Sequence, residues 1–465
     1  MPQSWNLVVK LALAELAALI NPTALATDAA TLEAYGFDAT RTRGEVLAVV
    51  WPATTAEVAA LVQWARRYHT PIIPRGRGTG MTGGSVPMTP SVVLSLERMT
   101  AIHSLDLSNR SVRVEPGVVN GDLQQFLAPH GFFWPPDPSS SLYCSIGGNI
   151  AEGSGGPKAV KYGVTKDWVL GLTAVTGSGE VIHTGAGTSK SVTGYDLTRL
   201  LVGSEGTLAI VTEAILKIAP QPQTKATIRA IYRGVKEAAE AVAAIMSSHI
   251  TPSALEFIDA ASCRAIETFN PVGLPDGAGG MLMIEVEGSV EGVATEAAEV
   301  ERLAAVEGVI SLRRAQNAAE AASLWKSRKA LSPALLRINP QKINEDIVVP
   351  VGRLPELVQW LEGQSKEQNI PIANFGHAGN GNIHVNLMVD PADTAMMARA
   401  EPLLDTLFHK VIEMGGSLSG EHGIGTMKSA WLGLEVDPAT LATMQGVRKV
   451  FDPDGILNPG KIFPA

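Results

Sequence analysis

The chain has 465 residues and a formal net charge of −9 at pH 7, and its cysteines are Cys144 and Cys263 alone. This length predicts about two or three domains with large cores. The negative charge gives no global support for nucleic-acid binding, and two cysteines exclude a disulfide framework or a cysteine zinc site. No apolar run reaches the length of a membrane span. We therefore predict a soluble, cytoplasmic protein.

The N-terminal sequence MPQSWNLVVKLALAELAAL predicts an amphipathic helix that packs on or caps the first domain. It lacks the charged n-region and cleavage site of a signal peptide. Downstream, TTAEVAALVQWARRYH predicts a helix capped by Thr54 or Thr55, because Glu57 follows and apolar residues recur at helical spacing. The strands predicted before residue 221 are TPIIP, SVVLSL, SVRVEPGV, GTLAIVTEAILKIAP and a pair in WVLGLTAVTGSGEVIHTG.

The first glycine-rich segment, PRGRGTGMTGG at residues 74–84, has the G-x-G-x-x-G spacing of a dinucleotide-binding turn. That turn must open a helix, but Pro87 and Pro90 follow and the next run, SVVLSL, reads as a strand. The segment is therefore not a Rossmann turn. Successive glycines instead allow a concave loop whose N–H groups bind an anion, with charge from Arg75 and Arg77. Taken alone, a solvated surface loop is the simpler interpretation.

From about residue 222, strands alternate with helices. KATIRAIYRG and GAGGMLMIEVEGSV predict strands, and they precede the predicted helices VKEAAEAVAAIMSSH and VATEAAEVERLAAVEG. A third helix, LPELVQWLEGQSKEQN, precedes IPIANFGHAGNGNIHVNLMV. This alternation predicts an α+β domain with helices on one face of an antiparallel sheet. The C-terminal residues predict helices and then a turn-rich tail, DPDGILNPGKIF.

A second glycine-rich segment, PPDPSSSLYCSIGGNIAEGSGGPKAVKYG at residues 135–163, also lacks the strand and helix of a Rossmann or Walker site. Together with PRGRGTG and with GSEGTLAIVTE at 203–213, it resembles the FAD-binding domain of the vanillyl-alcohol oxidase (PCMH) type. The C-terminal half carries WKSRKA, FGHAGNGNIHVN, SGEHGIGTMK and DPDGILNPGK. This ordered set resembles the FAD-linked D-2-hydroxyacid dehydrogenase family, which includes D-lactate dehydrogenases, the flavoprotein subunit of glycolate oxidase and D-2-hydroxyglutarate dehydrogenase.

The resemblance implies an α+β fold with a two-subdomain FAD-binding domain at residues 1–221. It implies a substrate-binding cap domain with an antiparallel sheet at 222–412, and a C-terminal helical segment at 413–465 that returns to the FAD domain. Residues 74–84 would wrap the FAD pyrophosphate, and 137–156 would enclose its other side, with Glu205 and Gly206 near the adenosine or the ring edge. The residues implied to bind FAD are Pro74, Arg75, Gly76, Gly78, Thr79, Gly80, Gly83, Gly84, Pro138, Ser141, Ser145, Gly148, Asn149, Gly155, Glu205, Gly206, Ile210 and Asn458.

Covalent members of this group carry a histidine in the first glycine-rich loop. This chain has no histidine between His69 and His103, so the resemblance implies that FAD is held noncovalently. The pair Gly153-Ser154 departs from relatives, which often have Asn-Ala at this place. We therefore expect no side-chain role for Gly153.

The segment GHAGNGNIHVN places His377 and His384 on either side of a glycine-rich turn, which lets the chain fold and bring both imidazoles together. Asn386 shares a face with His384 on the second strand. Glu421 lies in SLSGEHGIG, between glycines that allow close approach. Two histidines and a carboxylate form a three-ligand set with open positions, as in catalytic metal sites. The residues alone are also compatible with purely structural histidines.

The resemblance matches His377, His384 and Glu421 to the metal ligands of the hydroxyacid dehydrogenases, with zinc expected and manganese or iron as alternatives. It matches His422 to the proton acceptor. Arg328 matches the arginine that binds the substrate carboxylate. By the same comparison, Lys342 and Asn386 are further substrate-binding residues, although Lys342 is also compatible with a solvated lysine in a polar loop.

These roles imply an FAD- and metal-dependent dehydrogenase that oxidises D-lactate, glycolate or D-2-hydroxyglutarate. A non-redox enzyme like alkyl-glycerone-phosphate synthase is one alternative, but its chemistry needs no histidine cluster. A flavoprotein subunit that is inert alone is another. Expected partners are the small 2-hydroxy acid, an electron-acceptor protein or quinone, and a second copy or partner subunits. No nucleic acid or membrane span is expected.

Overall fold

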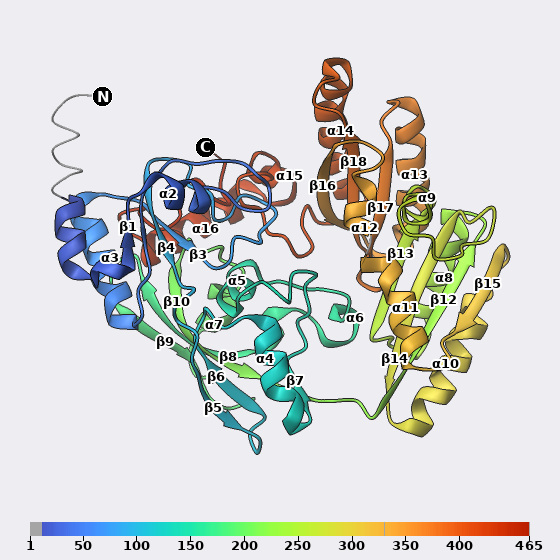
Figure 1. Cartoon of the computed structure of the whole chain (residues 1–465), viewed down its shortest axis with the longest axis horizontal. Coiled ribbons are helices and arrows are strands. Elements are labelled where there is room, and N and C mark those ends of the chain that lie inside the picture. Colours follow the sequence, from blue (N-terminus) through green and yellow to red (C-terminus); the bar gives the residue numbers. More distant parts are fainter. Residues whose placement is uncertain (1–11, 330, 465) are drawn as a thin grey trace. The chain divides into compact units, whose positions relative to one another are not determined.

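The computed structural model describes residues 12–329 and 331–464, which form two compact units (Figure 1). The first unit contains the residues up to Gly155, Val164–Gln221 and the chain from Glu421 onward. The second contains Gly156–Gly163 and Pro222–Gly420. Of the predicted N-terminal helix, residues 1–11 lie outside the described residues and 12–19 are helical. Within the described ranges, no helix combines the length and apolarity of a membrane-spanning segment.

The first unit holds a four-stranded sheet in the order β1-β2-β4-β3, a five-stranded sheet in the order β5-β6-β10-β8-β9, and the pair β11-β7. The four-stranded sheet pairs β2, β4 and β3 in parallel, and the five-stranded sheet is antiparallel. All the strands predicted in this region are confirmed. The strands are β1 (Leu25–Ala26), β2 (Val46–Val50), β3 (Ile72–Arg75), β4 (Ser91–Ser95), β5 (Ile102–Asp106), β6 (Ser111–Val114), β7 (Phe132–Phe133), β8 (Val169–Thr176), β9 (Val181–Gly185), β10 (Ala209–Lys217) and β11 (Ala219–Pro220).

Helix α3 is the predicted capped helix, and the Thr54 hydroxyl accepts a hydrogen bond from the Glu57 N–H at 3.2 Å. Its apolar stripe, including Leu61 and Trp64, is buried in the core of the first unit. The C-terminal tail also joins this unit, because Leu457 forms a parallel bridge with Ile72 of β3. The helices of the unit are η1 (Pro22–Ala24), α2 (Ala29–Tyr35), α3 (Thr55–Tyr68), α4 (Asn120–Leu127), η2 (Ala128–His130), α5 (Ile146–Glu152), η3 (Thr165–Asp167), α7 (Leu197–Leu201), η6 (Ser429–Trp431), α15 (Leu432–Glu435) and α16 (Pro438–Phe451).

The second glycine-rich segment contains helix α5, which the sequence analysis did not predict. Glycines disfavour a helix, but the Ser145 hydroxyl caps this one by accepting from the Gly148 N–H at 3.2 Å. Gly147 is required by packing, since a Cβ there would lie 2.6 Å from Cβ of Pro116. The glycines therefore allow a short helix to approach the neighbouring backbone closely.

The second unit is built on a seven-stranded antiparallel sheet in the order β15-β12-β14-β13-β17-β18-β16. The antiparallel α+β prediction is confirmed. The strands are β12 (Thr224–Tyr232), β13 (Ala254–Asp259), β14 (Gly280–Gly288), β15 (Val309–Arg314), β16 (Gln341–Val348), β17 (Ile372–His377) and β18 (Asn382–Val389). The helices are α6 (Ala159–Tyr162), α8 (Val235–Met246), α9 (Ala260–Phe269), α10 (Val290–Ala304), α11 (Ala318–Lys329), α12 (Leu331–Leu335), η4 (Val351–Arg353), α13 (Leu354–Glu367), η5 (Ala378–Asn380) and α14 (Thr394–Glu413).

Helices cover both faces of this sheet, so the prediction of helices on one face is wrong. The Tyr232 hydroxyl donates to the Ala304 carbonyl of α10 at 2.9 Å. Ile231, the preceding residue of β12, packs instead in a cluster with Cys263 and Ile266 of α9. Adjacent strand residues point to opposite faces, so α9 and α10 lie on opposite sides. Helix α9 was missed because its apolar stripe is short and directly follows a strand.

Two segments belong to the second unit although the sequence analysis assigned them elsewhere, namely 156–163 and 413–420. In the first, the Tyr162 hydroxyl donates to Glu287 of β14 at 2.5 Å. In the second, Ser417 exchanges both backbone hydrogen bonds with Val348 of β16 at 2.9 and 3.0 Å. The contacts of Tyr162 and of Ser417 with the sheet explain why the segments 156–163 and 413–420 belong to the second unit.

Candidate functional site

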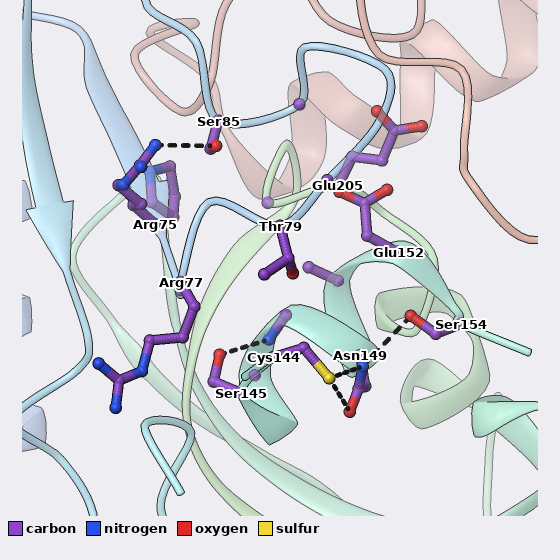
Figure 2. Close-up of a pocket in the computed structure, with 18 of the residues that line it drawn as sticks. Arg75, Arg77, Thr79, Ser85, Cys144, Ser145, Asn149, Glu152, Ser154 and Glu205 are labelled. Carbon is purple, nitrogen blue, oxygen red and sulfur yellow. Dashed lines mark hydrogen bonds between the residues drawn. The ribbon is translucent and has the colours of Figure 1, made fainter. Parts of the chain in front are cut away.

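A cavity in the first unit is lined by the two glycine-rich segments and by residues 201–211 (Figure 2). Most residues that the resemblance implied for FAD line it, namely Pro74, Arg75, Gly76, Gly78, Thr79, Gly80, Gly84, Pro138, Ser145, Gly148, Asn149, Glu205, Gly206 and Ile210. Gly83, Ser141, Gly155 and Asn458 do not line it. Lining residues that the sequence analysis did not name include Ser139, Ser140, Cys144, Glu152 and Ser154.

The first glycine-rich loop offers the cavity a row of unused backbone donors. The N–H groups of residues 77–81 donate to no acceptor within the described part of the chain. Gly78 has a φ of +65°, and a Cβ there would lie 2.1 Å from a terminal nitrogen of Arg75, so this turn requires glycine. Residues 77–81 all line the cavity, and backbone N–H groups without internal partners can bind an anion. The loop therefore fits a pyrophosphate such as that of FAD.

Arg75 holds the first glycine-rich loop in place through contacts of its own side chain. Its Nη1 donates to the Ser85 hydroxyl at 3.2 Å, and its guanidinium lies over the Tyr35 ring at 5.4 Å. Burial lowers the pKa of Arg75. Arg77 instead reaches Glu97, 3.6 Å away, and Figure 2 shows it directed away from the other labelled side chains. The charge that the sequence analysis assigned to both arginines is thus used mainly to shape the loop.

Asn458 and Glu205 hold the wall of the cavity together. The Asn458 amide donates to the carbonyls of Gly84 and Glu205 at 2.8 and 2.7 Å. The Glu205 carboxylate accepts from the N–H groups of Ile424 and Gly425 at 2.7 and 2.8 Å. Burial raises the pKa of Glu205. The structure therefore gives Glu205 a role in holding the segment after His422.

Glu421 and His422 line this same cavity of the first unit. The His422 carbonyl accepts from the Thr82 hydroxyl at 3.0 Å, which ties the residue to the first glycine-rich loop. Its Nε2 lies 3.8 Å from Oε1 of Glu421. A Cβ on Gly155 would lie 2.9 Å from Oε2 of Glu421, so that glycine leaves room for the carboxylate. The His422 imidazole and the Glu421 carboxylate thus share a cavity with the first glycine-rich loop.

In the second unit, one face of the sheet gathers the other predicted residues. The strand register places Phe375 opposite His384, and His377 opposite Glu256. The turn at η5 brings His377 and His384 together, with ring centroids 5.3 Å apart and the rings nearly perpendicular. Both histidines are buried. The expected juxtaposition of the imidazoles is therefore present.

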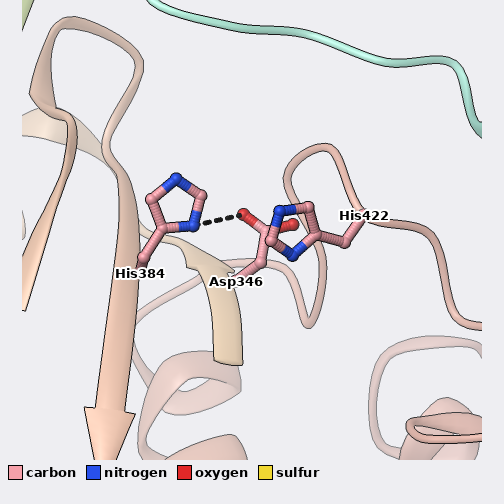
Figure 3. Close-up of side chains that lie close together, drawn as sticks. All are labelled: Asp346, His384 and His422. Atoms are coloured by element: carbon pink, nitrogen blue, oxygen red, sulfur yellow. Dashed lines mark ion pairs between the residues drawn. The ribbon is translucent and has the colours of Figure 1, made fainter. Parts of the chain in front are cut away.

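Each histidine has a buried carboxylate beside its Nδ1. His377 Nδ1 lies 2.5 Å from Oε1 of Glu256, and His384 Nδ1 lies 3.7 Å from Oδ1 of Asp346 (Figure 3). Asp346 also accepts from the Gly420 N–H at 2.9 Å, so the residue that precedes Glu421 is anchored on this sheet. Neither carboxylate is predicted by a local sequence pattern, because strand register brings both of them to the histidines.

Glu256 also pairs with Arg328, whose Nε lies 2.7 Å from Oε2. Burial would raise the pKa of Glu256, but the neighbouring His377 and Arg328 outweigh it and lower the pKa to about 2. Arg328 lies over the Phe375 ring at 4.6 Å. Within residues 12–329 and 331–464, its terminal nitrogens donate no hydrogen bond. They remain available for an anionic group.

The remaining predicted residues are more fully engaged. The Asn386 amide donates to the carbonyls of Ala373 and His384 at 3.0 Å, and its oxygen accepts from Asn344 at 2.8 Å. Lys342 Nζ donates to the Ser332 hydroxyl at 2.9 Å, and burial lowers the pKa of Lys342. Asn386 therefore supports the strands, whereas Lys342 keeps further donors.

Comparison with known proteins agrees with these features. Residues 221–462 match the family described as FAD linked oxidases, C-terminal domain, and residues 46–185 match the FAD binding domain family. Glycolate oxidase subunit GlcD of Bacillus subtilis (strain 168) is 40% identical over 430 residues, which are 92% of each chain. D-lactate dehydrogenase of Anaerostipes hadrus is 34% identical, over 91% of this chain and 90% of the relative. D-2-hydroxyglutarate dehydrogenase of Stutzerimonas stutzeri (strain A1501) is 33% identical, over 97% and 98%.

Among solved structures, p-cresol methylhydroxylase with substrate bound superposes with a TM-score of 0.81 at 16% identity, over 99% of this chain and 97% of that one. Alkyldihydroxyacetonephosphate synthase gives a TM-score of 0.73 at 19% identity, over 97% and 85%. At these identities the similarity shows the fold alone, and it confirms the PCMH-type fold class. With the family matches and the close relatives, it follows that the chain belongs to the FAD-linked oxidases and is an FAD-dependent oxidoreductase.

Proposed function

We propose that this protein oxidises a D-2-hydroxy acid to the 2-oxo acid, with FAD as the hydride acceptor and a divalent metal at the hydroxyl. The observation that carries the proposal is the sheet face on which a pair of buried imidazoles stands beside Arg328. Arginine with free terminal nitrogens suits a carboxylate, and paired imidazoles suit a divalent metal. Relatives named for glycolate oxidase, D-lactate dehydrogenase and D-2-hydroxyglutarate dehydrogenase support the same substrate class.

The proposed roles follow from the groups present. The first glycine-rich loop would hold FAD, which would supply the acceptor for the Cα hydride and its electron pair. His377, His384 and Glu421 would hold the metal, which would supply a Lewis acid for the substrate hydroxyl. His422 takes the hydroxyl proton on a ring nitrogen, and Arg328 binds the carboxylate through its terminal nitrogens. Lys342, which keeps unused donors, is a second candidate for the carboxylate.

The first measurement concerns how the flavin is bound and whether a hydroxy acid reduces it. The first glycine-rich loop contains no histidine, so we expect a yellow protein that releases all of its FAD into the supernatant on acid precipitation. Anaerobic addition of D-lactate, glycolate or D-2-hydroxyglutarate should then bleach the flavin absorbance. Flavin that stays in the pellet would contradict noncovalent binding. Bleaching by none of these acids would contradict the proposed substrate class.

The proposed metal ligands can be tested through metal content. Zinc is the expected ion, with manganese or iron as alternatives, because imidazoles with a carboxylate suit all of them. Alanine at His377, His384 or Glu421 should lower metal content and flavin reduction together, while FAD content stays at the wild-type level. His409→Ala, at an exposed histidine of α14, is the matched control and should change neither. The ligand assignment fails if metal-free protein reduces its flavin at the native rate.

Partners form a further part of the proposal. The relative named as a glycolate oxidase subunit suggests that the chain works with other subunits. We also propose a second copy as an alternative to other subunits, and an electron-acceptor protein or quinone as a further partner. Reduction of an artificial dye by the isolated chain and a hydroxy acid would show that catalysis itself needs no partner. The alkyldihydroxyacetonephosphate synthase similarity is a similarity of fold, and that alternative offers no role for the paired imidazoles.

A further inference from the structure

Glu256 holds a position that the proposed reaction does not by itself explain. It lies in β13, directly opposite His377 of β17, and its side chain is fully buried. One oxygen contacts His377 Nδ1 at 2.5 Å, and the other accepts from Arg328 Nε at 2.7 Å. A single carboxylate therefore touches a candidate metal ligand and the candidate substrate arginine at the same time.

The contact with His377 fixes the tautomer of the imidazole. A carboxylate that neutralises a permanently charged guanidinium is an acceptor, so Nδ1 of His377 carries the proton and donates it to Glu256. The lone pair then lies on Nε2, on the side away from Glu256. A carboxylate behind a ligating histidine orients the ring and makes it a stronger donor to a metal.

The contact with Arg328 fixes the guanidinium in the same way. Glu256 accepts from Nε, and the Phe375 ring lies under the guanidinium. The Phe375 ring also contacts His384, with centroids 5.4 Å apart. Within the described residues, both terminal nitrogens of Arg328 are thereby left for a ligand in one fixed orientation, which is what two-point recognition of a carboxylate requires.

We propose that Glu256 is a positioning residue that aligns His377 for the metal and Arg328 for the substrate carboxylate, so that the two binding events share one support. This inference rests on the proposed function. It deepens that function by linking metal affinity to substrate affinity through a residue that touches neither ligand. Because of this linkage, a change at Glu256 should affect both metal affinity and KM, and a purely structural buried carboxylate would not affect the two together.

The test compares Glu256→Gln with Glu285→Gln. Glu285 lies on the same face in β14, is 4% exposed, and also holds α11, by accepting from Trp325 Nε1 at 3.2 Å, but it does not touch His377. An amide cannot accept at both of its ends, so Glu256→Gln must lose the alignment of His377 or of Arg328. We expect its metal dissociation constant, measured by chelator competition, to rise about 10–100-fold. KM for the hydroxy acid should rise as well, with FAD content unchanged.

The single-ligand variants complete the pattern. His377→Ala should weaken metal binding, and Arg328→Ala should raise KM with metal affinity retained, whereas Glu256→Gln affects both. Glu285→Gln should affect neither. If Glu256→Gln does not fold because Arg328 is left unpaired, Glu256→Gln in an Arg328→Gln background removes that imbalance, and its metal affinity is compared with that of Arg328→Gln alone.

Wild-type metal affinity in Glu256→Gln, or in the paired background, overturns the inference even if KM changes. Equal losses in Glu256→Gln and Glu285→Gln also overturn it, because the effect is then a general one of buried charge. A wild-type protein that binds no metal overturns the proposed function itself. Metal that is lost in His377→Ala but retained in Glu256→Gln leaves the proposed function standing and removes only this inference.

Discussion

Replacing His422 with alanine should slow flavin reduction by about 10²–10⁴-fold, the usual loss when a general base is removed, while metal and FAD stay bound. The residue lines the cavity of the anion-binding loop, and its carbonyl, which alanine keeps, is the group that accepts from Thr82. The substitution should therefore remove the imidazole without releasing the segment. Anaerobic stopped-flow reduction, with metal and flavin content measured on the same sample, checks this expectation.

The comparison with Glu421→Ala separates the base from the metal ligand. Excess Zn²⁺ or Mn²⁺ should restore flavin reduction in chelated wild-type protein but not in His422→Ala. The assignment of His422 is wrong if its alanine variant loses the metal as completely as Glu421→Ala does. It is equally wrong if flavin reduction in His422→Ala proceeds at the wild-type rate.

Arg328→Ala should cost roughly 2–5 kcal/mol of transition-state binding, because it removes the guanidinium proposed to pair with the substrate carboxylate in a buried setting. That range corresponds to about a 30- to 5,000-fold loss in kcat/KM. The Arg328 side chain is 11% exposed and its terminal nitrogens donate no hydrogen bond within the described residues, so little water is available to compensate for its loss. Arg337→Ala, at an exposed arginine after α12, is the control and should leave kcat/KM unchanged.

The same arginine should set the handedness of the substrate. In the proposed roles, a carboxylate on Arg328, a hydroxyl at the metal and a hydride directed at the flavin would fix three points around Cα, and three points select one enantiomer. D-lactate should therefore bleach the flavin far faster than L-lactate. Equal reduction by both enantiomers, or an unchanged kcat/KM in Arg328→Ala, would contradict this geometry.

The sequence predicts the parts of the site that local motifs encode. Glycines in PRGRGTG allow a concave loop, and the turn in GHAGNGN brings His377 to His384. It does not predict Glu256 or Asp346, because each reaches its histidine through pairing between strands far apart in the chain. Such registers depend on the whole sheet, and no short pattern in ALEFID or NEDIV announces them.

Contacts between distant residues also explain parts of the fold that the sequence does not predict. Helix α5 forms in a glycine-rich run because the Ser145 hydroxyl caps it. Gly147 is present there because the close packing against Pro116 leaves no room for a larger residue. The segment 156–163 joins the second unit through Tyr162 and Glu287, which is a tertiary contact. Propensity and periodicity describe short windows of sequence. The packing of Gly147 against Pro116 and the contact of Tyr162 with Glu287 depend instead on neighbours distant in the chain.

The pairing of the C-terminal tail with β3 has a consequence for biosynthesis. Asn458 ties Gly84 to Glu205, and Leu457 bridges to Ile72, so the first glycine-rich loop is held by a residue that is translated 374 positions after Gly84. Ribosomes add about 5–20 residues per second, so the nascent loop waits many seconds for its closing segment. A nascent chain that still lacks residues 457 and 458 therefore lacks the contacts that tie Gly84 to Glu205 and the tail to β3.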